Sequence, residues 1–141
     1  ELALQRLEEE ISAQMLAKPD SMLKSKTVAG LTRYILSATA FEPGTSTLTA
    51  SAKTALMQLA KKLKTNDKPI QIEAYTDAAG SEPENVLFTQ KRADAVAAQF
   101  KSGGISSKII NAKGMGSSKS IANNQSKTGR ALNRRIEIFQ K

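Results

Sequence analysis

The segment from Tyr75 to Arg92 constrains the fold most, because it combines the end of a strand, a turn and the start of a helix. Apolar and polar residues alternate over 70–75, which is typical of a half-buried strand. A turn containing glycine and serine follows, and a helical pattern begins near Asn85. Asp77 and Arg92, fifteen positions apart, are therefore expected on one rim of a small α/β layer, facing a common cleft.

The rest of the chain alternates between strand and helix patterns. Polar segments at 18–29 and 114–127 are expected to form loops, the second of them mobile because it offers little apolar surface for packing. The order strand, helix, strand, helix, strand, strand favours an open α/β sandwich with helices on one face of a mixed sheet. The expected elements are strand 31–37, helix 50–63 with Thr49 as N-cap, strand 70–75, a helix from about Asn85 to Ser102, strand 108–113 and strand 132–140.

The residue patterns of two of these elements predict which side chains face the core. In the last strand, Ile136 and Ile138 are expected to face inward and the residues between them outward. The outward set is Arg135, Glu137 and Phe139. The expected core stripe of the second helix is Phe88, Ala93, Val96, Ala97 and Phe100.

The first residues predict a separate amphipathic helix over 1–17, ended by Pro19. Two interpretations stay open: a helix packed on the domain, or a spacer or coiled-coil arm leading to a membrane anchor. The predicted division is a helix and linker over 1–29 and one domain over 30–141. Because no initiator methionine or leader pattern is present, the chain is expected to begin after a processed or removed segment.

The composition excludes several enzyme classes. The chain has 141 residues with no cysteine and no histidine, which removes thiol chemistry, the usual neutral-pH base and the commonest zinc ligands. A hydrolase would need an acid and base pair or a metal, and no such pair is evident. We therefore expect a protein that is not an enzyme and uses no metal and no cofactor.

The formal net charge of +8 favours anionic partners. An aromatic content of 4% leaves few stacking platforms for bases, and the lysines are dispersed, so nucleic acid is not the expected partner. A basic nucleic-acid-binding domain remains the alternative from a different functional class. Its test is a salt-dependent DNA titration.

The residues alone leave the role of the Asp77 and Arg92 pair open. The pair can hold the two ends of a zwitterion, with Arg92 as a bidentate donor, or it can be a plain salt bridge. Thr76 adds a hydroxyl beside Asp77, and Asn85 either contacts a ligand or caps the helix. Arg134 can line the same cleft, or it can be an exposed cation of the strand face that meets Glu137 or solvent.

Several short motifs occur together in one order and spacing. They are Ala74-Tyr75-Thr76-Asp77, Gly80-Ser81, Asn85, Arg92-Ala93, Gly104-Ile105, Gly114-Met115-Gly116 and Thr128-Gly129-Arg130-Ala131-Leu132-Asn133-Arg134-Arg135-Ile136-Glu137-Ile138. With them the chain resembles the OmpA-like peptidoglycan-binding domain over roughly 31–139. The resemblance implies an α+β fold, a βαβαββ two-layer sandwich with helices on one face of a mixed sheet, here with an additional N-terminal helix.

The resemblance also implies a ligand and a site. The ligand is the diaminopimelate residue of the cell-wall peptide, whose amino group meets Asp77 and whose carboxylate meets Arg92. Thr76, Asn85 and Arg134 assist in this arrangement. Glu42, Tyr75 and Arg130 are secondary candidates.

The implied function is a non-catalytic periplasmic anchor that fixes a membrane complex to peptidoglycan. The chain looks most like the periplasmic part of a MotB-type inner-membrane subunit, a homodimer that would pair with a channel-forming partner in an ion-driven motor or secretion system. The alternative within the family is the soluble part of an outer-membrane lipoprotein or porin.

The sequence departs from the family pattern beside the site. Ala74 stands where a glycine is usual, and Glu82 and Glu84 add negative charge. Because mild acid would begin to neutralise such carboxylates, binding to wall fragments is expected to be stronger there.

Overall fold

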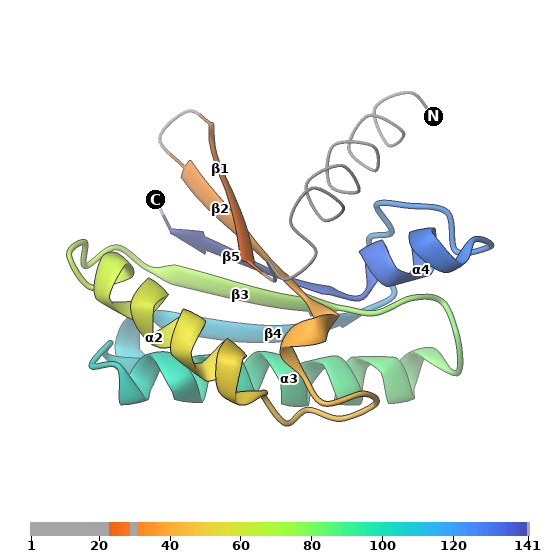
Figure 1. The fold of residues 1–141 in the computed structure, drawn as a ribbon, viewed down its shortest axis with the longest axis horizontal. Helices are drawn as coiled ribbons and strands as arrows, with labels where there is room; N and C mark the ends of the chain where they lie inside the picture. Colours follow the sequence, from red (N-terminus) through yellow and green to blue (C-terminus); the bar gives the residue numbers. More distant parts are fainter. Residues whose placement is uncertain (1–22, 29–30, 141) are drawn as a thin grey trace.

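A five-stranded mixed sheet forms the centre of the structure, which is a computed structural model describing residues 23–28 and 31–140 (Figure 1). The strand order is β1-β2-β5-β3-β4, with β3 and β4 parallel and the other pairs antiparallel. The predicted helix over 1–17 lies outside the described residues. The strands are β1 (Leu23–Val28), β2 (Leu31–Ser37), β3 (Ile70–Tyr75), β4 (Ile110–Gly116) and β5 (Arg135–Gln140), and the helices are α2 (Ala50–Leu63), α3 (Glu82–Ser102) and α4 (Lys127–Asn133).

The helices α2 and α3 lie against one face of this sheet (Figure 1). The core between the two layers consists of fully buried apolar side chains from β2, α2, β3, α3 and β5. The largest of them are Leu36, Leu56, Ile70, Ile72, Val96, Phe100 and Ile138. This confirms the predicted α+β sandwich with its long helices on one face.

The starts of α2 and α3 show which local sequence signals predict a helix start correctly. Thr49 caps α2 as predicted, with its hydroxyl accepting from the amide of Ala52 at 3.1 Å. The prediction for α3 was wrong by one turn, because the helix begins at Glu82 with Ser81 as its cap. The earlier start was missed because of Pro83. Proline is tolerated in the first turn of a helix, since the amides there have no partner within the helix.

Two strands differ from the prediction. The expected loop over 23–28 is β1, an edge strand whose polar residues Lys24 and Ser25 suit an exposed edge. The third predicted strand, 108–113, is β4 and extends to Gly116. A β-carbon on Gly114 would come within 2.2 Å of the Gln90 amide nitrogen, so the glycines that suggested a loop allow close contact with α3.

The segment after β4 is packed, contrary to the expected loop without apolar packing. Ile121 and Ala122 are buried against Leu132 in a small second core. Leu132 belongs to α4, so the predicted strand over 132–140 was wrong in its first residues. The buried side chain of Asn133 holds this segment by four hydrogen bonds: its Oδ1 accepts from the amides of Ile121 and Ala122, and its Nδ2 donates to Ala122 O and Asn124 Oδ1.

The face of β5 away from α2 and α3 is also less exposed than predicted. Ile136 and Ile138 point into the core, as expected. Arg135 and Glu137, expected outward, lie on the opposite face but are buried and ion-paired at 2.7 Å. Arg33 makes a second pair with Glu137 at 2.9 Å, so the charges on this face compensate one another.

We expect Asn133→Ala to lower the free energy of unfolding by about 2–4 kcal/mol, because it leaves the buried amides of Ile121 and Ala122 without an acceptor. Urea unfolding followed by circular dichroism measures this loss. Asn111→Ala is the control, because it makes the same substitution at an exposed position of β4, where the side chain bonds only to Gln71 at the surface. Equal stability of the two variants would show that Asn133 does not support the segment.

Candidate functional site

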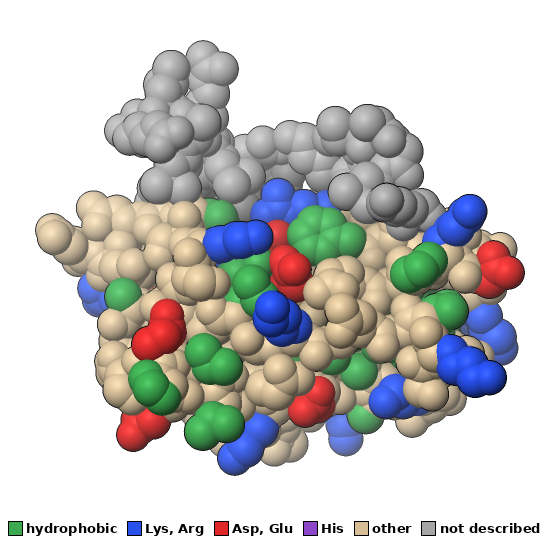
Figure 2. All heavy atoms as spheres, turned by 180° about the vertical axis from the view of Figure 1, so that it is seen from behind, with side chains coloured by type: hydrophobic (Ala, Val, Ile, Leu, Met, Phe, Trp, Pro, Cys, Tyr) green, Lys and Arg blue, Asp and Glu red, His purple; other side chains and the backbone are tan. Residues whose placement is uncertain are grey.

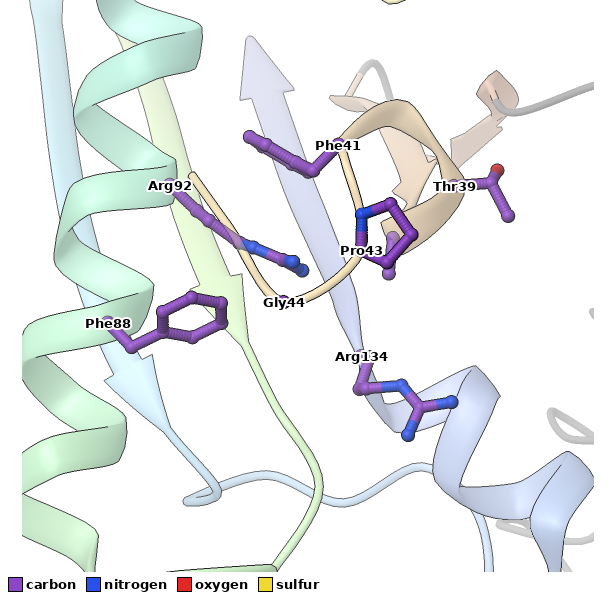
Figure 3. Close-up of a pocket in the computed structure, with 8 residues that line it drawn as sticks. Thr39, Phe41, Pro43, Gly44, Phe88, Arg92 and Arg134 are labelled. Atoms are coloured by element: carbon purple, nitrogen blue, oxygen red, sulfur yellow. The ribbon is translucent and has the colours of Figure 1, made fainter. Parts of the chain in front are cut away.

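The site lies where α3 and the residue that follows α4 approach the segment after β2. A cavity of about 430 Å³ opens there. Its walls combine apolar groups with two guanidinium groups (Figure 3). The lining residues are Ala38, Thr39, Phe41, Pro43, Gly44, Phe88, Arg92 and Arg134.

Arg92 reaches this cavity from α3 between two aromatic rings (Figure 3). Its guanidinium carbon is 4.5 Å from the ring centroids of both Phe41 and Phe88. The Nε donates to the carbonyl oxygen of Thr45 at 2.9 Å. These contacts fix the direction of a side chain that is only 6% exposed.

The loop from Phe41 to Leu48 supplies that carbonyl. Phe41 and Leu48 form an isolated bridge, and the amide of Thr45 donates to Glu42 O at 3.0 Å. Gly44 has a φ of 70°, which favours glycine at this turn. The loop therefore holds one face of the cavity and the Arg92 acceptor together.

Burial, and to a smaller extent the nearby charge of Arg134, lower the pKa of Arg92 to about 10. The guanidinium of Arg92 therefore stays protonated at neutral pH, and its buried charge is incompletely compensated. Among the described residues, no carboxylate forms an ion pair with Arg92. An anion bound in the cavity would supply that compensation.

Asp77 lies two residues after the end of β3 and is 6% exposed. Its Oδ2 accepts from Arg134 Nη1 at 2.8 Å, and its Oδ1 accepts from the amide of Ala79 at 3.0 Å. The alternative of a plain Asp77–Arg92 salt bridge is therefore wrong, because the partner of Asp77 is Arg134. The alternative pairing of Arg134 with Glu137 is also wrong, because Glu137 pairs with Arg33 and Arg135.

Thr76 and Asn85 hold the loop that carries Asp77. The Thr76 amide donates to Gly116 O at 2.9 Å. Asn85 lies in the first turn of α3, not at its cap, and its Nδ2 donates to Ala79 O at 3.0 Å. In the structure, both residues therefore position Asp77.

The three secondary candidates lie outside the cavity lining. Tyr75 points to the other face of the sheet, where its hydroxyl donates to Glu73 and Arg135 lies 4.0 Å from its ring centroid. Arg130 donates to the carbonyl of Asn124 within the α4 region. Glu42 is exposed on the loop beside Pro43.

Sequence reasoning missed the aromatic walls. Phe88 was assigned to the core stripe, yet it is half-buried and lines the cavity, whereas Ala93, Val96, Ala97 and Phe100 are buried as predicted. Its position four residues before Arg92, on the same helix face, was the available signal. The described residues include no cluster of three or more carboxylates placed to hold a metal ion.

A comparison with protein families decides the relationship of this chain. The model of the OmpA family matches residues 40–134, which include the loop, Asp77, Arg92 and Arg134. The chain belongs to the OmpA family.

Curated OmpA-family relatives match over parts of their length. The chain is 33% identical over 93 residues to the outer-membrane lipoprotein YfiB of Pseudomonas aeruginosa, covering 65% of this chain and 55% of the relative. It is 40% identical over 84 residues to the peptidoglycan-binding protein ArfA of Mycobacterium tuberculosis, covering 59% of this chain and 26% of the relative. The chain thus spans about half, or less, of these relatives.

Solved structures share the OmpA-like fold over nearly the whole chain. A MotB-like protein from Desulfovibrio vulgaris matches with a TM-score of 0.77 and 21% identity, covering 99% of this chain and 91% of that one. The cell wall anchor of the T6SS from Pseudomonas aeruginosa matches with a TM-score of 0.78 and 20% identity, covering 97% and 95%. These likenesses confirm the fold predicted from the OmpA-like motifs.

Double-mutant cycles in this OmpA-family domain test the ion pairing. We expect a coupling of about 1 kcal/mol between Asp77→Asn and Arg134→Gln, modest because the Arg134 side chain is 40% exposed and screened by solvent. The matched cycle of Asp77→Asn with Arg92→Gln should give less than half of that. Chemical denaturation measures both, and a larger coupling to Arg92 would contradict the geometry.

Proposed function

We propose that this domain binds peptidoglycan by holding the diaminopimelate side chain of the stem peptide in the cavity beside Arg92. The observation that carries the proposal is the Arg92 guanidinium, which has no ion-pair partner in the described part of the chain and is fixed between Phe41 and Phe88. Its Nε is occupied by a backbone carbonyl, and its terminal nitrogens remain for a bidentate carboxylate. Membership of the OmpA family and likeness to a peptidoglycan-binding protein and a cell wall anchor support the same ligand.

The ligand ammonium would be accepted by Asp77. In the structure, Arg134 occupies Oδ2 of this carboxylate, and Arg134 also lines the cavity. Binding of the zwitterion then requires Arg134 to share Asp77 with the ammonium or to turn toward a ligand carboxylate. Its exposed side chain has room for that movement.

The proposed role is mechanical anchoring and not catalysis. The ligand would be held through charges and hydrogen bonds, and no covalent bond of the cell wall would be cleaved. The domain would act in the periplasm of a bacterial envelope. The helices in the described part of the chain are all too short or too polar to span a bilayer.

The likeness to MotB periplasmic domains supports a subunit attached to the inner membrane, working as a dimer with a channel-forming partner in a motor or secretion system. The likeness to YfiB and to the probable lipoprotein YiaD of Escherichia coli supports a lipid-anchored alternative. The sequence preceding Glu1 in the intact protein distinguishes them. An apolar helix carrying an acidic residue indicates ion-driven work, and a lipidated cysteine indicates a lipoprotein.

We expect Asp77→Ala and Arg92→Ala each to reduce co-sedimentation with purified sacculi by about tenfold or more, because each removes a charged partner of the ligand. Arg92→Lys should lose nearly as much, since lysine lacks the planar fork. Lys91→Ala, an exposed neighbour on α3, is the matched control. If both alanine variants bind like the unchanged protein, the proposed site is wrong.

Sacculus binding should change by less than about twofold between about pH 8 and about pH 5. Hydrogen bonds from the amide and hydroxyl of Ser117 hold the pKa of Glu82 below its usual value, so this carboxylate stays charged in mild acid. Glu82→Gln should therefore leave the pH profile unchanged in shape. A larger rise in mild acid that Glu82→Gln abolishes would contradict this prediction.

A further inference from the structure

A group of exposed lysines lies at one end of the molecule. We call this group the basic pole and define it as Lys61, Lys62, Lys64, Lys68, Lys101 and Lys108. Figure 2 shows Lys and Arg side chains gathering at this end, on the right of that view. In the chain segments that carry the pole, 61–68 and 101–108, Asp67 is the one acidic residue.

Packing brings these segments together although they are distant in sequence. A β-carbon on Gly104 would lie 2.6 Å from Lys64 Nζ, and one on Gly103 would lie 2.7 Å from Ala60 Cβ, so the ends of α2 and α3 adjoin. Gln140 at the end of β5 donates to the carbonyls of Leu63, Asn66 and Lys68. The pole is therefore one continuous end of the domain.

Stabilisation of helix ends does not account for the whole group. Lys61, Lys62 and Lys101 lie in the last turns of α2 and α3, where cations favour the helix dipole. Lys68 lies in the connection before β3, and Lys108 in a single 3₁₀ turn before β4. Within the described part of the chain, none of the six lysines forms an ion pair.

The pole lies opposite the cavity. β3 starts beside the pole at Ile70, next to Gln140, and leads to Asp77 at the site. At about 3.3 Å per residue, this strand and its continuation separate the two by about 20 Å. A flat partner at the pole would therefore leave the cavity open.

We propose that the basic pole docks on an anionic phospholipid bilayer. Lysines are compact point charges that suit the dense phosphate of a headgroup layer, and a charged surface attracts each one independently. Readout of nucleic-acid bases would need stacking side chains, and the segments that carry the pole, 61–68 and 101–108, contain no aromatic residue. The domain would then meet a bilayer at one end and hold its ligand at the other.

The test is co-sedimentation of the 141-residue chain with vesicles of phosphatidylcholine, with or without phosphatidylglycerol. The pole variant changes Lys61, Lys62, Lys64 and Lys68 to glutamine. The control variant makes the same change at four other exposed lysines, and so removes the same charge. These are Lys53, Lys113, Lys119 and Lys127. Circular dichroism checks that both fold.

The expected result is binding only to vesicles containing phosphatidylglycerol, lost at high salt. The pole variant should bind at least about a hundredfold more weakly, because each of its four lysines contributes about fivefold near the surface, and the control should bind less than about threefold more weakly. No binding to the anionic vesicles, or an equal loss in both variants, overturns the proposal. Binding to duplex DNA that depends on the same four lysines, without binding to vesicles, also overturns the proposal.

The pole and the cavity are tested separately. The pole variant should keep its binding to sacculi, because none of its substitutions touches a residue lining the cavity. Failure of vesicle binding alone therefore refutes the bilayer proposal, and failure of sacculus binding in the unchanged protein refutes the proposed function.

Discussion

The site depends on one buried cation, Arg92, held between the rings of Phe41 and Phe88 and hydrogen-bonded through Nε to Thr45 O. These contacts join the loop after β2 to α3 and fix the guanidinium at the cavity. None of them neutralises the charge, and burial with the nearby Arg134 lowers the pKa of Arg92 to about 10. The described part of the domain thus keeps an uncompensated cation where a ligand carboxylate would sit, which is a common cost of a preorganised binding site.

The second half of the site depends on the packing of the chain between β4 and β5. Asn133 binds the segment around Ile121 and Ala122 and ends α4, which places Arg134 against Asp77. The domain therefore supplies its own temporary partner for the carboxylate. In the proposed binding mode, Arg134 shares Asp77 with the ligand ammonium or turns toward a ligand carboxylate, so the Asp77–Arg134 ion pair opposes binding of an ammonium group.

Local patterns predicted the helix α2, the strand β3 and the inward residues of β5, because these elements follow simple periodicity and a clear cap. They predicted neither the full length of β4 nor the strand β1. The glycines of β4 allow close contact with α3, and β1 is a polar edge strand. Asp77, Arg92 and Arg134 were predicted as site residues, and the structure brings them to one end of the sheet. Their pairing was not predictable, since it depends on α4, whose residues resembled loop and strand. The aromatic enclosure of Arg92 also requires the folded loop at Phe41.

In the proposed site, Arg92 selects a ligand carboxylate. Isothermal titration calorimetry can test this selection with two stem peptides, one ending in diaminopimelate and the other carrying lysine, which keeps the ammonium but lacks that carboxylate. The diaminopimelate peptide should bind at least about tenfold more tightly, the scale of a charge-assisted bidentate contact. Equal affinity for the two peptides would contradict it.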